Sequence, residues 1–132
     1  MYFKLKENVL FRKYSKYGYL ADNSLFGYRF LNDPTQELEE KYVSESAAVM
    51  LETLGRIPQH IDDIVNKLLL IFIGVEADEL KQDVCDFFIQ LCQEGYLSYG
   101  KTFDECNNSN KRKLNDDYIQ SNESLVENCS GK

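Results

Sequence analysis

The sequence has few of the residues that bind metal ions. It contains a single histidine, His60, and four cysteines, Cys85, Cys92, Cys106 and Cys129. No two of these cysteines have CxxC spacing, and His60 stands far from them in the chain. A structural zinc site needs four such ligands in closely spaced pairs, so the sequence predicts no metal centre.

Motifs for catalysis are also missing. There is no P-loop, nucleophile elbow, HExxH pair or glycine-rich dinucleotide fingerprint. His60 stands at a predicted helix start, where a capping or surface role is expected rather than that of a general base. The acidic pairs Asp62-Asp63 and Asp78-Glu79 open predicted helices, where the helix dipole favours carboxylates. We therefore expect no enzymatic activity and no cofactor.

Segments for membrane insertion or export are missing too. The longest apolar run, Leu68–Ile73, has about a third of the length that spans a bilayer. The N-terminal residues Met1–Lys6 lack the apolar core of a signal peptide. We therefore expect a cytoplasmic protein without a membrane partner.

What the sequence does have is an uneven distribution of charge. Residues 1–31 carry six basic and two acidic side chains, a net charge of +4. Residues 32–100 carry four basic and fourteen acidic side chains, a net charge of −10. Such a polarised surface suits a charged partner at one place rather than a nucleic-acid backbone along its whole length.

Strand-forming residues are concentrated near the N-terminus. Aromatic and branched residues dominate Val9–Tyr14, Tyr17–Asp22 and Leu25–Leu31, and short polar turns separate these segments. This pattern predicts a three-stranded antiparallel sheet. The acidic stretch that follows, to Glu40, is expected to be a solvated loop.

Three helices are predicted after the sheet. Ser44 is expected to cap the first helix, and Gly55 to end it. The second runs from about His60 to Ile73, and the third from about Ala77 to Glu94 with Gly95 as its C-terminal cap. The predicted fold is α+β and winged-helix-like, an N-terminal three-stranded antiparallel sheet followed by a three-helix bundle.

The remaining segment lacks a hydrophobic period. Residues 101–132 are polar and nearly aperiodic, so we expect a disordered tail or a linker there. The predicted domain is residues 1–100.

The predicted third helix carries two stripes of residues at helical spacing. The first is assigned to the core and consists of Leu80, Val84, Phe87 and Leu91. The second mixes apolar and charged side chains and consists of Lys81, Cys85, Phe88 and Cys92. It is assigned to the wall of a groove, with Lys81 and Phe88 partly exposed. A wide core face that takes in both stripes is the alternative, and spacing alone does not decide between them.

The same helix argues against DNA binding. A winged-helix protein brings basic or amide side chains to the phosphates of DNA. Residues 77–94 instead hold five acidic residues and one lysine, a net charge of −4, which repels a polyanion. A DNA-binding transcription regulator is therefore kept only as the alternative function.

Hydrophobic and glycine positions in three segments carry a family resemblance. The segments are Tyr42–Leu54, His60–Leu68 and Val84–Leu97. With them, residues 9–97 resemble the PqqD-like family, the recognition elements of ribosomally synthesised and post-translationally modified peptides (RiPPs). Gln36–Lys41 resembles an insertion into the family pattern.

The resemblance implies a binding mode. In the family, a leader peptide joins the sheet as an antiparallel strand beside the third strand, in a groove closed by the third helix. Arg29 and Lys81 would meet carboxylates of an acidic leader, and Phe88 would accept an apolar anchor. The implied peptide-binding residues are Phe26, Gly27, Tyr28, Arg29, Phe30, Leu31, Lys81, Cys85, Phe88 and Cys92.

The resemblance also implies partners, namely a precursor peptide and a modifying enzyme such as a radical-SAM maturase. The chain has no CxxxCxxC motif, so that chemistry would belong to another protein or domain. A third interpretation is a structural adaptor that docks onto an enzyme through its acidic helices.

Overall fold

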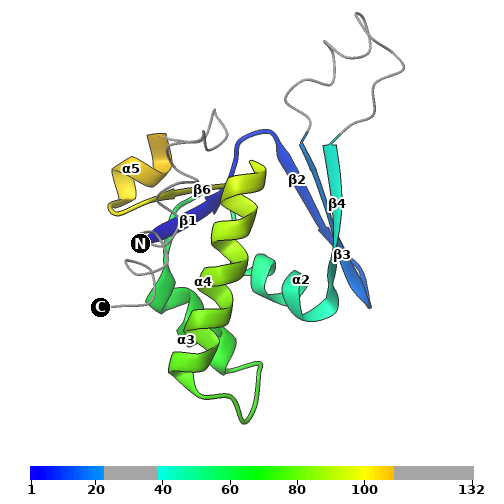
Figure 1. Cartoon of the computed structure of the whole chain (residues 1–132), viewed down its shortest axis with the longest axis vertical. Helices are drawn as coiled ribbons and strands as arrows, with labels where there is room; N and C mark the ends of the chain where they lie inside the picture. Colours follow the sequence, from blue (N-terminus) through cyan, green and yellow to red (C-terminus); the bar gives the residue numbers. More distant parts are fainter. Residues whose placement is uncertain (23–38, 109–132) are drawn as a thin grey trace, which may run out of the picture.

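The computed structural model describes residues 1–22 and 39–108, and the fold there is α+β, as predicted. The chain begins with strands β1 (Tyr2–Leu5), β2 (Val9–Lys13), β3 (Tyr17–Asp22) and β4 (Glu39–Ser44). It continues with α2 (Glu45–Glu52), β5 (Gln59–His60), α3 (Ile61–Leu69), α4 (Ala77–Glu94), β6 (Leu97–Gly100) and α5 (Phe103–Asn108). Figure 1 shows α4 between two small sheets.

The first sheet has the antiparallel order β2-β3-β4. The predicted strands at 9–14 and 17–22 are present as β2 and β3. Its third strand is β4, in a segment expected to be partly loop, whereas Leu25–Leu31 lies outside the described residues. The loop prediction is wrong because one face of this strand is in solvent: Glu40 and Tyr42 are exposed, while Val43 is buried. A solvated edge strand carries charge, which hides the strand signal.

The second sheet was not predicted. Its order is β5-β1-β6, so the N-terminal strand β1 pairs with short strands that come from later parts of the chain. The predicted arrangement, one N-terminal sheet followed by three helices, is therefore not confirmed, because it left out this second sheet. Strands of two and four residues are too short to show a hydrophobic period in sequence.

The helix starts follow the expected capping chemistry. Ser44 Oγ accepts a hydrogen bond from the backbone N–H of Ala47 at 3.2 Å, which caps α2. His60 Nδ1 accepts from the N–H of Asp62 at 3.1 Å and caps α3 in the same way. Both capping predictions are confirmed.

Two of the predicted helix ends differ from the structure. Helix α2 ends at Glu52, with Thr53 rather than Gly55 as its C-cap, and α3 ends at Leu69, with Leu70 as its C-cap, rather than at Ile73. Helix α4 has the predicted bounds, and Gly95 closes it with φ of 95°. Only glycine adopts this left-handed conformation without strain, which explains why this end was readable from sequence.

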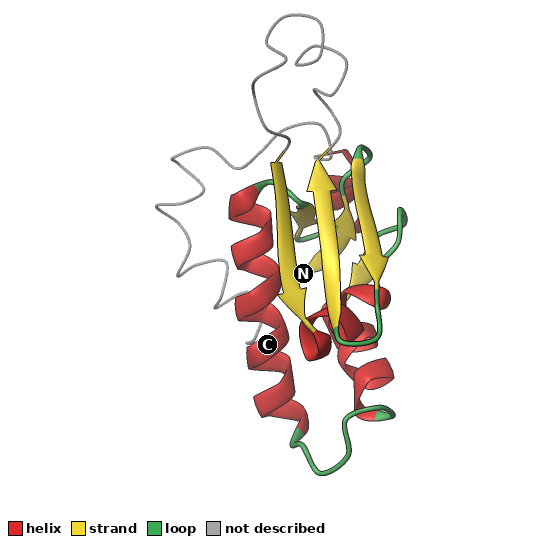
Figure 2. Cartoon of the chain, turned by 90° about the vertical axis from the view of Figure 1, so that its right-hand side faces the viewer, coloured by secondary structure: helices red, strands yellow, loops and turns green. Residues whose placement is uncertain are grey.

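One hydrophobic core joins both sheets to α2, α3 and α4. Helix α2 lies directly against β3 at Gly18, where an added Cβ would come within 2.8 Å of Ala48 Cβ. Figure 2, turned by 90°, shows α4 running alongside one edge of the β2-β3-β4 sheet. After β6 the chain continues as α5, which lies within the segment expected to be a tail.

Candidate functional site

Three residues of the predicted groove wall lie inside the core. Cys85, Phe88 and Cys92 are buried, and Phe88 is 0% exposed. The Phe88 ring packs edge-on against Phe3 of β1, with ring centroids 5.3 Å apart. The expectation that Phe88 is partly exposed is therefore wrong, and the wide core face is the arrangement that the structure has.

The fourth residue of that wall, Lys81, faces helix α3. Its Nζ lies 2.9 Å from Oδ1 of Asp62, and this hydrogen-bonded ion pair lowers the pKa of the Asp62 carboxyl. Two members of this stripe thus have contacts with neighbouring elements, Lys81 with α3 and Phe88 with β1. The other predicted site residues, 26–31, lie outside the described residues.

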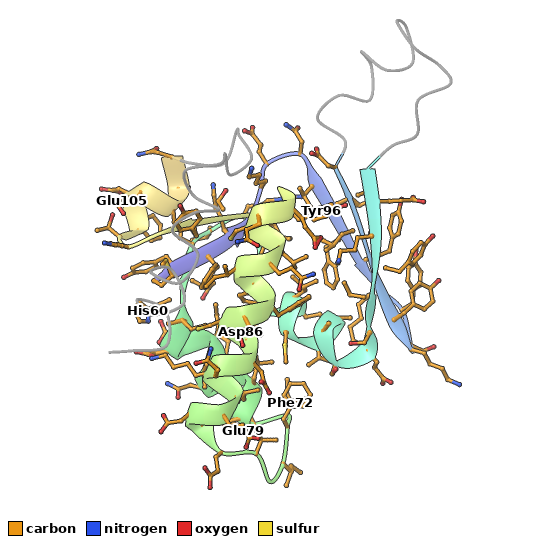
Figure 3. All side chains as sticks on the ribbon, in the orientation of Figure 1. His60, Phe72, Glu79, Asp86, Tyr96 and Glu105 are labelled. Carbon is orange, nitrogen blue, oxygen red and sulfur yellow. The ribbon has the colours of Figure 1, made fainter. Side chains whose placement is uncertain are left out.

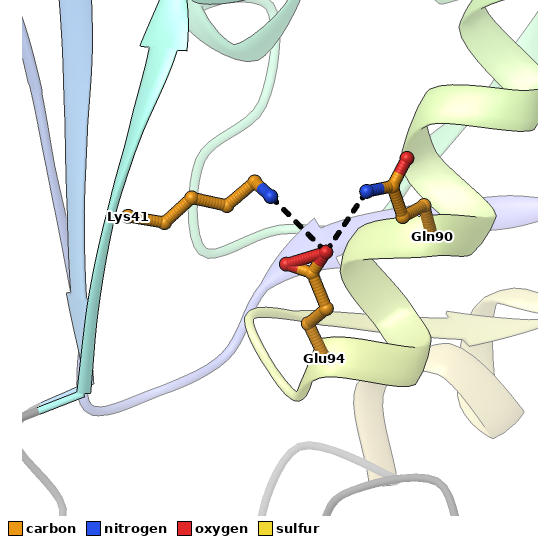
Figure 4. A network of polar contacts seen from close by, with 3 residues as sticks. All are labelled: Lys41, Gln90 and Glu94. Carbon is orange, nitrogen blue, oxygen red and sulfur yellow. Dashed lines mark hydrogen bonds and ion pairs between the residues drawn. The ribbon is translucent and has the colours of Figure 1, made fainter.

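A different side of α4 faces the β2-β3-β4 sheet. Lys41, on β4, reaches across to α4 and pairs with Glu94, with Nζ and Oε1 3.1 Å apart (Figure 4). Gln90 Nε2 donates to the same oxygen at 3.0 Å. A carboxylate in the last turn of a helix is disfavoured by the helix dipole, and the Lys41 ammonium offsets this.

Helical spacing identifies the other residues on this side of α4. Asp83, Phe87 and Gln90 precede Glu94 by eleven, seven and four residues, so they share its face. We call these four residues the β4-facing row. Phe87, expected in the core, is only partly buried and packs against the core from this row.

Strand β4 is an edge of its sheet. Among the described residues it pairs with β3 alone, so alternate backbone N–H and C=O groups point away from the sheet toward α4. Figure 2 shows no described element between β4 and α4. Such an edge is a template for pairing with another strand.

The opposite edge of the sheet is β2, and its start is partly closed. The guanidinium of Arg56 donates hydrogen bonds to the backbone oxygens of Val9 and Lys6. These contacts use an outward carbonyl of β2 that an added strand would need. Among the described residues, β4 is therefore the edge of this sheet for which no such side-chain contact to the backbone is seen.

The comparisons with known proteins identify a family for the central part of the chain. Residues 33–97 match the family model of Coenzyme PQQ synthesis protein D (PqqD). The chain carries a PqqD-like RiPP recognition element. Searches of curated proteins and of solved structures found no match. The matched range includes β4, α2, α3 and α4 but neither β2 nor β3.

The matched family has a general role in peptide modification. PqqD-family proteins are non-catalytic recognition components that bind a precursor peptide and act with radical-SAM enzymes. Within residues 1–22 and 39–108, no group of three or more potential ligands is placed to hold a metal ion. No helix in those ranges is long and apolar enough to cross a membrane.

The outer face of the sheet carries a tyrosine cluster that borders the β4 edge. The ring of Tyr42 lies 5.2 Å from that of Tyr19 and 5.8 Å from that of Tyr17, centroid to centroid. Tyr19 Oη donates to Glu40 Oε2 at 2.7 Å, which raises the pKa of Tyr19 to about 12. A strand paired with β4 would place alternate side chains next to Tyr42.

Sequence reasoning missed Lys41, Gln90, Glu94 and Tyr42 as site residues. Lys41 and Tyr42 belong to the strand that was not predicted. Gln90 and Glu94 are polar residues on a helix whose other sides are filled by core residues, which indicates an accessible side. Their position could be interpreted only once the neighbours of α4 were known.

Proposed function

We propose that this PqqD-like domain binds the leader region of a ribosomally synthesised precursor peptide by strand addition at β4. The bound peptide is then presented to a separate modifying enzyme, of which radical-SAM maturases are the expected class. The observation that carries the proposal is the open edge of β4 beside α4, within the range that matches the family.

In the proposed binding mode, different groups supply the affinity for the leader and the selection among leader sequences. Backbone hydrogen bonds to β4 supply affinity that tolerates changes of sequence. Successive side chains of an added strand point to opposite faces of the sheet. One set meets the β4-facing row, where Phe87 offers an apolar contact, and the other set meets Tyr42.

The charges at this edge revise the expected leader chemistry. Lys81 was expected to attract an acidic leader, but it is paired with Asp62 on the α3 side. At the β4 edge Lys41 is paired with Glu94, while Glu40 and Asp83 are exposed. These charges favour a leader with lysine or arginine near the edge.

The test is a fluorescence-polarisation titration of the full chain with the leader half of the precursor encoded beside its gene. We expect saturable binding in the micromolar range. Proline placed at successive leader positions should weaken binding at every second position, because it removes a ladder donor. Alanine at the same positions is the control for lost side chains. No binding up to about 1 mM would contradict the proposal.

A further inference from the structure

The connection between α3 and α4 exposes a run of large apolar side chains. In the segment Leu70–Val75, Leu70 is 85% exposed, Ile71 56% and Ile73 93%. Val75 is also exposed. Single exposed apolar residues are common, but four within six consecutive residues form a patch of the kind that marks an interaction site. We call these four residues the apolar turn.

The apolar turn has an ordered backbone. The N–H groups of Ile71 and Phe72 both donate to the carbonyl of Leu68, at 2.9 and 2.8 Å. Phe72 packs against the core, and Gly74 turns the chain with φ of 83°. The exposed side chains are therefore held in place before any partner arrives, which lowers the entropic cost of binding.

Acidic residues adjoin the patch on its C-terminal side. Glu76, Asp78 and Glu79 follow it directly and are exposed. The nearest preceding cation, Lys67, is engaged with Gln59 Oε1 at 3.3 Å. This charge favours a protein surface with basic side chains around an apolar pocket. It disfavours anionic lipid and also a second copy of this chain, whose own acidic residues would be repelled.

The apolar turn lies toward one end of β4, the strand that is proposed to bind the leader. Phe72 and Glu79 are labelled at one end of α4 in Figure 3, and α4 runs from there alongside β4. A protein bound at the apolar turn would therefore lie beyond one end of the strand that accepts the leader.

We propose that the apolar turn is the docking surface for the peptide-modifying enzyme. The enzyme would contribute an apolar pocket rimmed by lysine or arginine, and docking would bring it to the end of the bound leader. This proposal rests on the proposed function, since it assumes that a peptide is handed on.

The test measures binding of the full chain to the modifying enzyme encoded beside its gene, by calorimetry without peptide. L70S/I73S should weaken this binding at least about tenfold. The matched control is Ile57→Ser, because Ile57 is also exposed, at 64%, and lies outside the turn. It should change the affinity less than about twofold. Unchanged enzyme affinity in L70S/I73S, or no binding by the unmodified chain, would overturn the docking surface.

A second arm separates this proposal from the proposed function. L70S/I73S should bind the leader peptide as tightly as the unmodified chain does. Weakened enzyme binding with intact leader binding supports both proposals. Intact enzyme binding with intact leader binding overturns only the docking surface, and absence of leader binding in the unmodified chain overturns the proposed function.

Further measurements test whether the partner at the apolar turn is the enzyme, a lipid surface or a second copy of the chain. Replacing Glu76 and Glu79 with lysine should weaken enzyme binding most at low salt, and no effect would contradict the basic rim. Flotation with phosphatidylcholine vesicles, with and without phosphatidylglycerol, should show no binding. Sedimentation equilibrium should show a monomer. Vesicle binding or dimerisation that is lost in L70S/I73S would overturn the enzyme as occupant.

Discussion

Two sides of helix α4 differ in burial, although residues that are adjacent in the sequence lie on them. Phe88 points toward β1 and is fully buried against Phe3, whereas Phe87 belongs to the row that faces β4 and is only partly buried. The first side holds the domain together. The second side, with Gln90 and Glu94, borders the open strand edge. Two aromatic residues that are adjacent in the sequence thus differ in burial: Phe88 lies in the core, and Phe87 keeps part of its ring exposed.

The largest effect should come from the buried side. Phe88→Ala is expected to lower the free energy of unfolding by about 3–5 kcal/mol, because it leaves a cavity among core residues. Urea denaturation measures this. Gln90→Ala, on the exposed side of the same helix, is the control and should change stability by less than about 0.5 kcal/mol. A Phe88→Ala variant as stable as this control would show that the two sides have been assigned wrongly.

Phe87→Ala should divide its effect between stability and binding. Because the ring is partly buried, the expected loss of stability is about 1–2 kcal/mol. Leader affinity should fall by about tenfold, since the ring faces the added strand. Polarisation titrations at a temperature where the variant is folded separate the two effects. Unchanged leader affinity would place the peptide away from the β4-facing row.

The ion pair between Lys41 and Glu94 should contribute little to stability. Both side chains are about one-third exposed, so a double-mutant cycle with Lys41→Ala and Glu94→Ala should give a coupling of about 0.5 kcal/mol. The coupling should shrink as salt is added. A coupling of several kcal/mol would indicate a rigid, desolvated bridge, which a peptide could not enter without a large penalty.

The smallest effect concerns Lys81 and Asp62 on the opposite side. Because Lys81 lowers the pKa of the Asp62 carboxyl in the folded state, the pair stabilises the fold above the ordinary aspartate pKa. That contribution is lost as the pH falls below about 4, through the lowered pKa. Asp62 is 60% exposed, so the loss in Lys81→Gln should be only a few tenths of a kcal/mol. An NMR titration should show the Asp62 pKa rising in this variant, and an unchanged pKa would contradict the pairing.

Features that depend on local chemistry were predictable from the sequence. The caps at Ser44 and His60, the glycine end at Gly95 and both bounds of α4 follow from residue types at fixed positions. The family resemblance rests on the same hydrophobic and glycine positions, and it is confirmed.

Features that depend on distant neighbours were not predictable. Strand β4 was missed because its charged residues suit a solvated edge as well as a loop. The groove wall was assigned to residues of α4 that are mostly buried, because a stripe at helical spacing does not reveal what packs against it. Strand β1, which packs against Phe88 of that stripe, forms its sheet with segments more than fifty residues away in sequence.

Hydrogen exchange of the backbone amides in Glu39–Ser44, with and without bound leader, tests strand addition at β4 most directly. Strand addition at β4 should give new protection at alternate residues of β4 and none along β2, the other edge of the same sheet. Protection should disappear when the leader carries proline at a pairing position. Saturating leader that leaves exchange in β4 unchanged would contradict strand addition at this edge, even with binding itself established.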